Sequence, residues 1–458
     1  MSQTAPRDTR RVGTPPPASS PPDGPPAPAS PPNPAARRRP LLLVLLSVLG
    51  PGVVSAAAGN DAGGITTFSQ VGANYGYSLL WGLAVVTVGL IVVQEMCARM
   101  GAVTGKGLAD LIRENFGVKI TAFAMLILVI ANFAITVSEF AGIAAVGEMY
   151  LGFHARYYIV PASALLVWLL VSRGSYQRVE RIFLVASLVF LTYVVTALKI
   201  GVPWKHVAQA TFAPHLGALP WGPPLIVMLV TLIGTTISPY MQFYQQAAVR
   251  DKGITIRDYA LAKWDTIIGC VLSSLVAAFI VITCAGTLFA TGQHLDSSSS
   301  AADVAKALAP LAGNVGQMLF AFGLLNASLM AAVVVPLSTA YAVTESLGWA
   351  SGLGQRIREL PLFYGTYGAM IALSGGLIML LPPKTKLISL ILSAQIVNCA
   401  LLPVELVLIL ILINRRRVMG RYRNGFGLNF VAWVTTVVAA VLSLFLLGHQ
   451  IWAAVHGG

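Results

Sequence analysis

The sequence predicts an all-α integral membrane protein of about eleven transmembrane helices with a cytoplasmic N-terminus. Of its 458 residues, 56% are hydrophobic and 10% are charged, whereas a soluble domain is about 25% charged, so most of the chain cannot face water. The net charge of +13 lies in short clusters between apolar runs rather than on one exposed face. This pattern excludes a nucleic-acid binder. The lack of a nucleophile motif, a phosphate-binding loop or a histidine cluster argues against an enzyme.

Eleven apolar segments are long enough to cross about 30 Å of hydrocarbon. In chain order, spans 1 to 11 lie near residues 41–71, 76–98, 118–146, 157–172, 182–200, 223–248, 264–291, 313–343, 361–381, 386–413 and 428–448.

The basic residues between the spans predict the orientation. If the N-terminus is cytoplasmic, 24 of the 30 Lys and Arg residues lie on the cytoplasmic side. The others are Arg156, Lys199, Lys205, Lys306, Lys384 and Lys386. Because cytoplasmic loops carry the excess of basic residues, this asymmetry supports the span count and the inward N-terminus. We expect a multi-pass protein of the plasma membrane, or of the inner membrane in a bacterium.

The chain divides into four regions. Residues 1–40 hold 13 of the 27 prolines and predict a disordered cytoplasmic tail. Residues 41–200 and 201–413 hold two sets of five spans, and residues 414–458 hold a cytoplasmic loop and the eleventh span. The lipid bilayer is an expected partner, and the sequence does not predict an oligomeric state.

Spans 1 and 6 are interrupted near mid-depth. Residues 59–64 read Gly-Asn-Asp-Ala-Gly-Gly, and residues 234–239 read Gly-Thr-Thr-Ile-Ser-Pro. Unwound backbone at this depth is tolerated only where it lines a cavity. Since the two spans begin the two sets of five, the breaks predict the substrate site of a secondary transporter with inverted repeats.

Asp61 lies inside the first break. An ionised Asp at mid-bilayer costs at least about 2.5–3.5 kcal/mol, and an ordinary glycine kink would not offset that cost. A bound cation, helped by backbone carbonyls that the break frees, would offset it. We therefore take Asp61 as the leading metal ligand and include Ala58, just ahead of the break, among the candidates.

Motifs along the chain resemble the Nramp family of divalent-metal transporters. The matching residues are 50–52 (GPG), Asp61, 72–81 (GANYGYSLLW), 94–95 (QE), 99–101 (RMG), 104–108 (TGKGL), 173–174 (RG), Arg178, Glu180, Gln395 and 419–420 (MG). The resemblance runs from about residue 48 to 448 and is most specific in its first third. It implies the inverted five-plus-five fold of the leucine transporter with broken helices 1 and 6, one extra helix, no cofactor, and a divalent metal ion as substrate.

Two metal-binding positions depart from the family pattern. The family's first break reads Asp-Pro-Gly-Asn, with the Asp and Asn side chains on the metal; here Asp61 is kept and Gly64 stands at the Asn position. The family's second break reads Ala-x-x-Met-Pro-His-Asn, with the Ala carbonyl and the Met thioether on the metal. Here Thr235 stands at the Ala position, Ser238 at the Met position and Tyr240 at the His position.

These departures indicate a change of metal. A thioether favours softer transition metals, while hydroxyl, carboxylate, carbonyl and water suit Mg²⁺ and Mn²⁺. Loss of two side chains is expected to enlarge the site, and Mg²⁺ usually keeps several waters. The pattern resembles the magnesium-transporting branch related to Nramp. We interpret Met241, three residues beyond Ser238, as packing rather than as a substitute ligand.

Proton coupling is also expected to be absent. Proton-coupled relatives use an Asp three residues before a Glu in helix 3, and a His in helix 6. Glu139 matches the Glu, but Thr136 and Tyr240 replace the other two, and neither titrates near neutral pH. Glu139, Thr136, Tyr240 and Gln395 remain candidates for lining the ion path. Asn132, Asn326 and Asn398 are expected to form hydrogen bonds between helices.

Two other functions remain open. One is a proton-coupled Mn²⁺/Fe²⁺ symporter. The other is an organic-solute or amino-acid symporter on the same fold, in which Asp61 would bind an amine or Na⁺.

We predict that residues 1–40 are dispensable for transport, because their composition cannot support a packed core. A truncated protein that begins at Arg37 keeps the basic cluster that sets the orientation. Its uptake per inserted molecule should equal that of the full chain in proteoliposomes. Loss of uptake at normal insertion would give the tail a role in transport.

Overall fold

The computed structural model describes residues 51–173, 184–296, 299–308, 314–353, 355–383 and 385–456. They belong to the unit Leu45–Gly458, and the description below concerns this unit alone. The predicted tail at residues 1–40 and the first ten residues of span 1 lie outside the described residues. The four-region division and the cytoplasmic N-terminus remain predictions.

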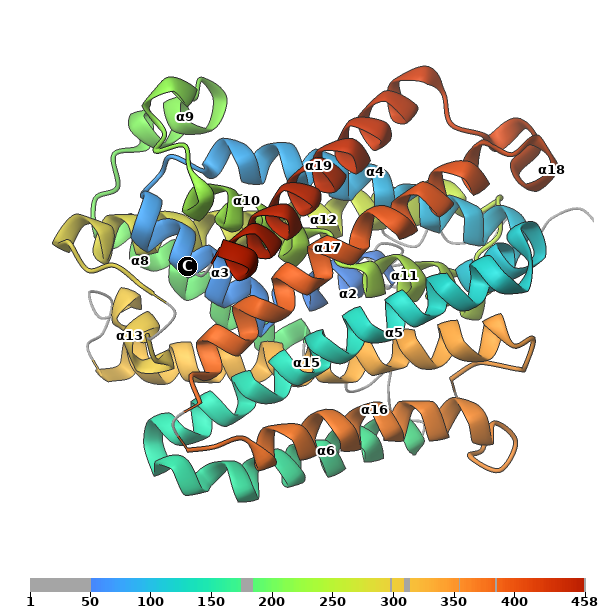
Figure 1. Cartoon of the computed structure of the whole chain (residues 1–458), viewed down its shortest axis with the longest axis horizontal. Coiled ribbons are helices and arrows are strands. Elements are labelled where there is room, and N and C mark those ends of the chain that lie inside the picture. The colour runs from blue at the N-terminus through green and yellow to red at the C-terminus, as the bar shows by residue number, and fades with distance from the viewer. Residues whose placement is uncertain are drawn as a thin grey trace, which may run out of the picture. The chain divides into compact units, whose positions relative to one another are not determined.

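The regular elements of the described residues are helices (Figure 1). Their bounds are α2 Pro51–Ala58, α3 Ala62–Tyr75, α4 Leu80–Thr104, α5 Leu108–Leu151, α6 Arg156–Ser172, α8 Leu191–Lys199, α9 Trp204–Phe212, α10 Pro223–Thr236, α11 Pro239–Asp251, α12 Tyr259–Thr287, α13 Ala301–Ala305, α15 Asn314–Ser346, α16 Pro361–Leu380, α17 Leu387–Asn414, α18 Arg416–Met419 and α19 Phe426–His456.

The predicted spans agree with these helices. By length and composition, nine helical stretches in the described part of the chain can each cross a membrane, and they correspond to spans 2, 3, 4 and 6 to 11. Span 5 is present as Leu184–Lys199, and the chain then bends by 115° into Trp204–Phe212, a turn that the sequence did not predict. The described part of span 1 consists of α2 and α3, which are too short to be counted singly.

Both predicted interruptions are present. In span 1 the helix stops at Ala58 and restarts at Ala62, so only Gly59–Asp61 lies outside regular helix. In span 6 it stops at Thr236 and restarts at Pro239. The unwound segments are shorter than the sequence motifs: Gly63 and Gly64 already belong to α3, and Gly234 to α10.

The helices pack in pairs that follow the two sets of five spans. Span 1 (α2 and α3) packs on span 7 (α12), and correspondingly span 6 (α11) packs on span 2 (α4). Likewise α5 packs on α6 as α15 packs on α16, and α5 and α15 pack against each other. This pairing is that of an inverted five-plus-five repeat, with α19 as the additional helix.

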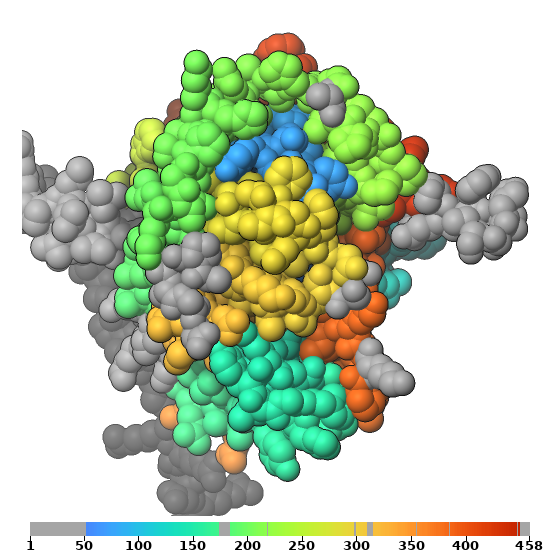
Figure 2. Space-filling view, turned by 90° about the vertical axis from the view of Figure 1, so that its left-hand side faces the viewer, coloured from blue at the N-terminus to red at the C-terminus, as the bar shows by residue number. Residues whose placement is uncertain are grey.

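The connections at one end of the unit cover the end of α3. Figure 1 places the α5–α6 connection, α9 and α13 at this left-hand end, which Figure 2 views directly. There the Asn74 amide donates to the Leu295 carbonyl at 2.6 Å and accepts from the Leu295 N–H at 3.0 Å. The opposite end carries the α4–α5, α15–α16 and α17–α19 connections, which the basic residues assign to the cytoplasm.

Small residues bring α2 against α12. A Cβ atom on Gly269 would lie 2.7 Å from the Gly52 carbonyl oxygen, so the two backbones touch. The Gly52 N–H also donates to the Asp265 carboxylate at 2.8 Å. Without a hydrophobic driving force between helices in lipid, close packing of this kind and cross-helix hydrogen bonds hold the spans together.

We predict that Gly269→Val destabilises the protein. The added side chain would push α12 away from α2, and overpacking of this kind costs about 1–3 kcal/mol. The melting temperature in detergent should fall clearly below that of wild type. Gly376→Val in α16 is the matched control, because no atom lies within 4 Å of a Cβ there. Equal melting temperatures for the two variants would contradict the contact.

Candidate functional site

Asp61 has two structural environments, one for each oxygen. It is the N-cap residue of α3, and its Oδ1 atom accepts a hydrogen bond from the Gly64 N–H at 2.7 Å. Its Oδ2 atom has no hydrogen-bond partner among the described residues, although the side chain is fully buried. Asp is a preferred N-cap, and its negative charge is stabilised at a helix N-terminus. The capping role was not predicted from the sequence, although an Asp before a new helix is its ordinary signal.

Glu139 of α5 reaches the same break. Its Oε2 atom accepts a hydrogen bond from the Ala62 N–H at 3.1 Å, and its Oε1 atom accepts one from the Ser138 hydroxyl at 3.2 Å. The side chain is fully buried. Two carboxyl groups therefore bind the first turn of α3. Glu139 accepts from the N–H of Ala62, and Asp61 accepts from the N–H of Gly64. A position that holds two such groups in apolar surroundings favours a positively charged ligand.

Tyr240 connects the two breaks. Its hydroxyl donates to the Ala58 carbonyl at 2.9 Å, across from α11 to the last residue of α2. The Ala58 carbonyl is thus partly engaged, although a carbonyl oxygen has a second lone pair. Tyr240, which the sequence resemblance places at a histidine position, acts here as a hydrogen-bond donor to the first break.

Ser238 is held by its own neighbours. Its hydroxyl donates to the Gly234 carbonyl at 3.1 Å and accepts from the Asn398 amide at 2.9 Å. The same amide donates to the Gly234 carbonyl at 2.6 Å. The predicted cross-helix role of Asn398 is confirmed, and it places α17 against the second break.

Several buried polar atoms near the breaks have no hydrogen-bond partner among the described residues. They include the Thr235 hydroxyl, both amide atoms of Gln395, and the Asn398 Oδ1 atom. A Cβ atom on Gly63 would collide with the Gln395 side chain, so this side chain lies directly over the start of α3. Since buried polar groups usually have partners, such a group of atoms is typical of a site that binds a polar or charged ligand.

Gly64 does not leave open space. A Cβ atom there would lie 2.8 Å from the Gly59 carbonyl and 3.4 Å from Asp61 Oδ1. The expectation that the missing side chain at position 64 enlarges the site is therefore wrong for this conformation. The physical reason is that α3 begins at Ala62, so its first turn folds back over the break.

Met241 packs closely on the first break. A Cβ atom on Gly59 would lie 3.7 Å from the Met241 sulfur, and closer to its methyl group. The residue is 1% exposed. This is a packing contact, but it also brings a thioether within two residues of Asp61.

Three further predictions concern polar residues on α5 and α15. Thr136 donates to its own helix, at the Asn132 carbonyl at 2.7 Å, which uses its single proton. Asn132 donates to the Thr339 hydroxyl of α15 at 2.9 Å, and Asn326 donates to the Ser187 hydroxyl at 3.1 Å, as predicted for cross-helix hydrogen bonds.

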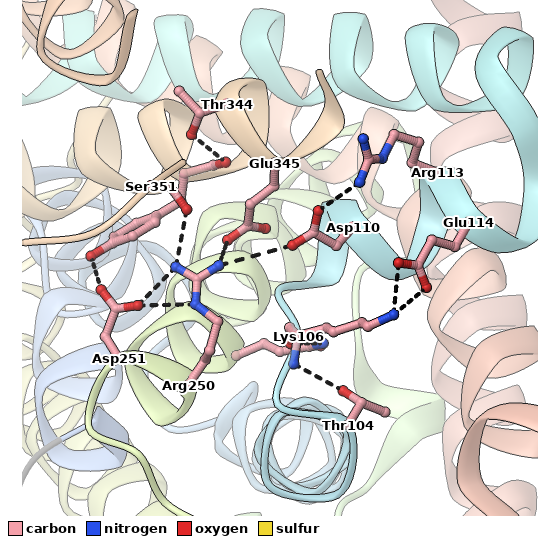
Figure 3. A network of polar contacts seen from close by, with 12 residues as sticks. Thr104, Lys106, Asp110, Arg113, Glu114, Arg250, Asp251, Thr344, Glu345 and Ser351 are labelled. Atoms are coloured by element: carbon pink, nitrogen blue, oxygen red, sulfur yellow. Dashed lines mark hydrogen bonds and ion pairs between the residues drawn. The ribbon is translucent and has the colours of Figure 1, made fainter. Parts of the chain in front are cut away.

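A network of charges fixes α11 at the end opposite to that of Figure 2. Arg250 contacts Glu345 of α15 at 2.6 Å, Asp251 at 2.8 Å and Asp110 of α5 at 4.0 Å (Figure 3). The Glu345 side chain is 2% exposed, and a buried charge of this kind needs its partner. The network therefore ties α5, α11 and α15 together between the second break and the end assigned to the cytoplasm.

Comparison with known sequences agrees with this geometry. The family model described as natural resistance-associated macrophage protein-like (Nramp) matches residues 52–449. The divalent metal cation transporter MntH of Deinococcus radiodurans is 26% identical over 426 residues, which cover 90% of this chain and 91% of that protein.

Solved structures share the fold. The Eremococcus coleocola manganese transporter superposes with a TM-score of 0.75 at 19% identity, over 92% of this chain and 90% of its own. MhsT, solved in complex with L-phenylalanine, has a TM-score of 0.60 at 16% identity, over 86% of this chain and 97% of its own. At these identities the likeness concerns the fold alone, and it confirms the predicted fold class.

Proposed function

This chain belongs to the Nramp family, and we propose on that premise that its two broken helices carry a divalent metal ion across the membrane. As a member of this family it is a multi-pass membrane transporter and not an enzyme. The plasma membrane, or the inner membrane of a bacterium, is the location that we propose.

The observation that carries the proposal is the pair of buried carboxyl groups at the start of α3. Asp61 keeps one oxygen without a hydrogen-bond partner among the described residues, and Glu139 binds the adjacent backbone N–H. A divalent cation bound at Asp61 would supply the positive charge that a buried carboxylate needs, and the backbone carbonyls freed at the two breaks suit a metal ion as further ligands. This favours a metal ion over the organic-solute alternative. Ala58 and Thr235 would add oxygen ligands from the two breaks.

Within the divalent ions we propose Mg²⁺ as the preferred substrate, with Mn²⁺ also accepted. Position 238 carries a hydroxyl that is already hydrogen-bonded to Asn398, in place of a thioether. An oxygen-lined site suits Mg²⁺ and Mn²⁺ more than softer metals. The small size of Gly64 supports this proposal less than the sequence suggested, since the backbone of Gly59 occupies the space.

We propose that transport is not coupled to protons. The Thr136 hydroxyl is committed to its helix, and Tyr240 donates to Ala58. A proton carrier must release and regain a proton. The hydroxyl protons of both side chains are instead held in these hydrogen bonds. Glu139 is then a positioning group for α3 rather than a proton carrier.

The second candidate is a Mn²⁺ transporter, and one observation favours it. The Met241 sulfur lies against Gly59, so a soft ligand is near the first break although none stands at position 238. The similar proteins from Deinococcus and Eremococcus are named as a divalent metal cation transporter and a manganese transporter.

We predict that Asp61→Asn abolishes transport without unfolding the protein. The Asn side chain keeps the N-cap of α3 but lacks the charge, so uptake should fall at least about tenfold, the effect of losing about 1.4 kcal/mol of ion binding. Asp61→Ala should fail equally in uptake and should also be less stable by about 1 kcal/mol, because it lacks the cap. The matched control is Asp303→Asn, which makes the same chemical change at a partly exposed carboxylate of the short helix α13. Radiotracer uptake in proteoliposomes and melting in detergent measure the two effects. Normal uptake by Asp61→Asn would remove its charge from the site.

A competition assay separates the two candidate metals. We predict that Mg²⁺ competes with Mn²⁺ uptake in wild type, and that Ser238→Met weakens this competition several-fold by adding a thioether that Mg²⁺ uses poorly. Met241→Leu should leave the competition unchanged, because Leu preserves the packing. If Met241→Leu instead abolishes Mn²⁺ uptake, and Mg²⁺ does not compete in wild type, the manganese candidate is correct. We leave Gly64 unchanged in this test, since a side chain there would displace the Gly59 carbonyl.

A further inference from the structure

A second polar site lies away from the broken helices. A cleft of about 620 Å³ is lined by Thr104, Lys106, Leu111, Glu114, Asn115, Arg415, Arg417 and Val418. We call it the basic cleft. It lies between the end of α4, the first turns of α5 and α18, at the end that the charge distribution assigns to the cytoplasm.

The basic cleft carries excess positive charge. Lys106 binds both carboxylate oxygens of Glu114 at 2.7 Å, which neutralises the only acidic side chain in the lining (Figure 3). Arg415 and Arg417 are the other two charges. The connection from α17 to α19 that supplies them reads Arg-Arg-Arg-Val-Met-Gly-Arg-Tyr-Arg over residues 415–423, with no acidic residue.

Arg415 is positioned by neutral groups. Its guanidinium donates to the Asn115 carbonyl at 2.9 Å and to the Asn115 side-chain oxygen at 3.2 Å. It also lies 4.8 Å from the centre of the Phe116 ring. These contacts fix the direction of the guanidinium but leave its charge uncompensated, so it is preorganised for an anion. The Arg417 side chain is exposed.

Exposed apolar residues lie on α5 and α19, close in the chain to the residues of the cleft. After Gly117, whose φ of 77° interrupts the helix, Val118 and Phe123 are 78% and 57% exposed. At the start of α19, Phe426 is 89% exposed. Exposed apolar residues next to a cluster of basic residues form the surface that a lipid needs, with a place for its headgroup and for its acyl chains.

We propose that the basic cleft binds the headgroup of an anionic phospholipid of the cytoplasmic leaflet. The headgroup phosphate would accept hydrogen bonds from Arg415 and Arg417, and the acyl chains would lie along the exposed face of α5. The net positive charge of the lining disfavours a cation and favours an anion. A free phosphate ion offers the same charge but does not use the apolar surface.

The test compares lipid binding to the whole protein in nanodiscs of phosphatidylcholine with and without phosphatidylglycerol. Native mass spectrometry after release should find phosphatidylglycerol retained on wild type in preference to phosphatidylcholine. Arg415→Gln combined with Arg417→Gln should weaken this retention by roughly tenfold or more, since each basic residue adds attraction to an anionic surface. Arg356→Gln combined with Arg358→Gln removes two exposed charges from the same end and should have no effect.

Two further measurements make the test decisive. Arg417→Gln alone changes an exposed side chain and should not disturb folding. It should therefore show part of the loss of phosphatidylglycerol retention even if the double variant folds poorly. Excess inorganic phosphate should not displace the lipid. If it does, or if wild type retains the two lipids equally, the cleft is an anion site without lipid specificity and the proposal is wrong. Equal losses in the two double variants would also overturn it, because the attraction would then be spread over the whole surface.

Discussion

A carboxyl group inside an apolar helix bundle must be compensated, and the rest of this structure depends on how Asp61 is compensated. The chain interrupts span 1 there, so that a new helix begins at Ala62 and offers its N-terminal N–H groups to the carboxylate. This satisfies one oxygen. The other oxygen has no hydrogen-bond partner among the described residues, and it is available to a cation.

The surrounding helices maintain this arrangement from several sides. Glu139 binds the next N–H of α3, and Tyr240 binds the carbonyl at which α2 ends. Asp265 binds the first turn of α2, where glycine contacts bring it against α12. At the other break, Asn398 links Ser238 to α17. The first break is thus held from both halves, by Glu139 of its own half and by Tyr240 of the other, whereas the second break is held by Asn398 of its own half.

The sequence predicted the spans, both breaks and the family, because apolar length, Gly-rich motifs and basic loops are read locally along the chain. It missed features that depend on contacts between helices or on the exact start of a helix. The N-cap role of Asp61 depends on α3 starting at Ala62. The lack of room at Gly64 depends on the Gly59 carbonyl, and the engagement of Ser238 depends on Asn398, which lies 160 residues away. The bend after Lys199 also escaped prediction, since periodicity alone does not give the direction of the following helix.

The central claim is that a divalent cation binds the free oxygen of Asp61 between the two breaks. Anomalous scattering from crystals soaked in Mn²⁺ locates such an ion directly. The account predicts one strong peak about 2.0–2.5 Å from Asp61 Oδ2, with further oxygen ligands from the segments around Ala58 and Thr235. A peak bound elsewhere, or none at a Mn²⁺ concentration that saturates transport, would contradict it.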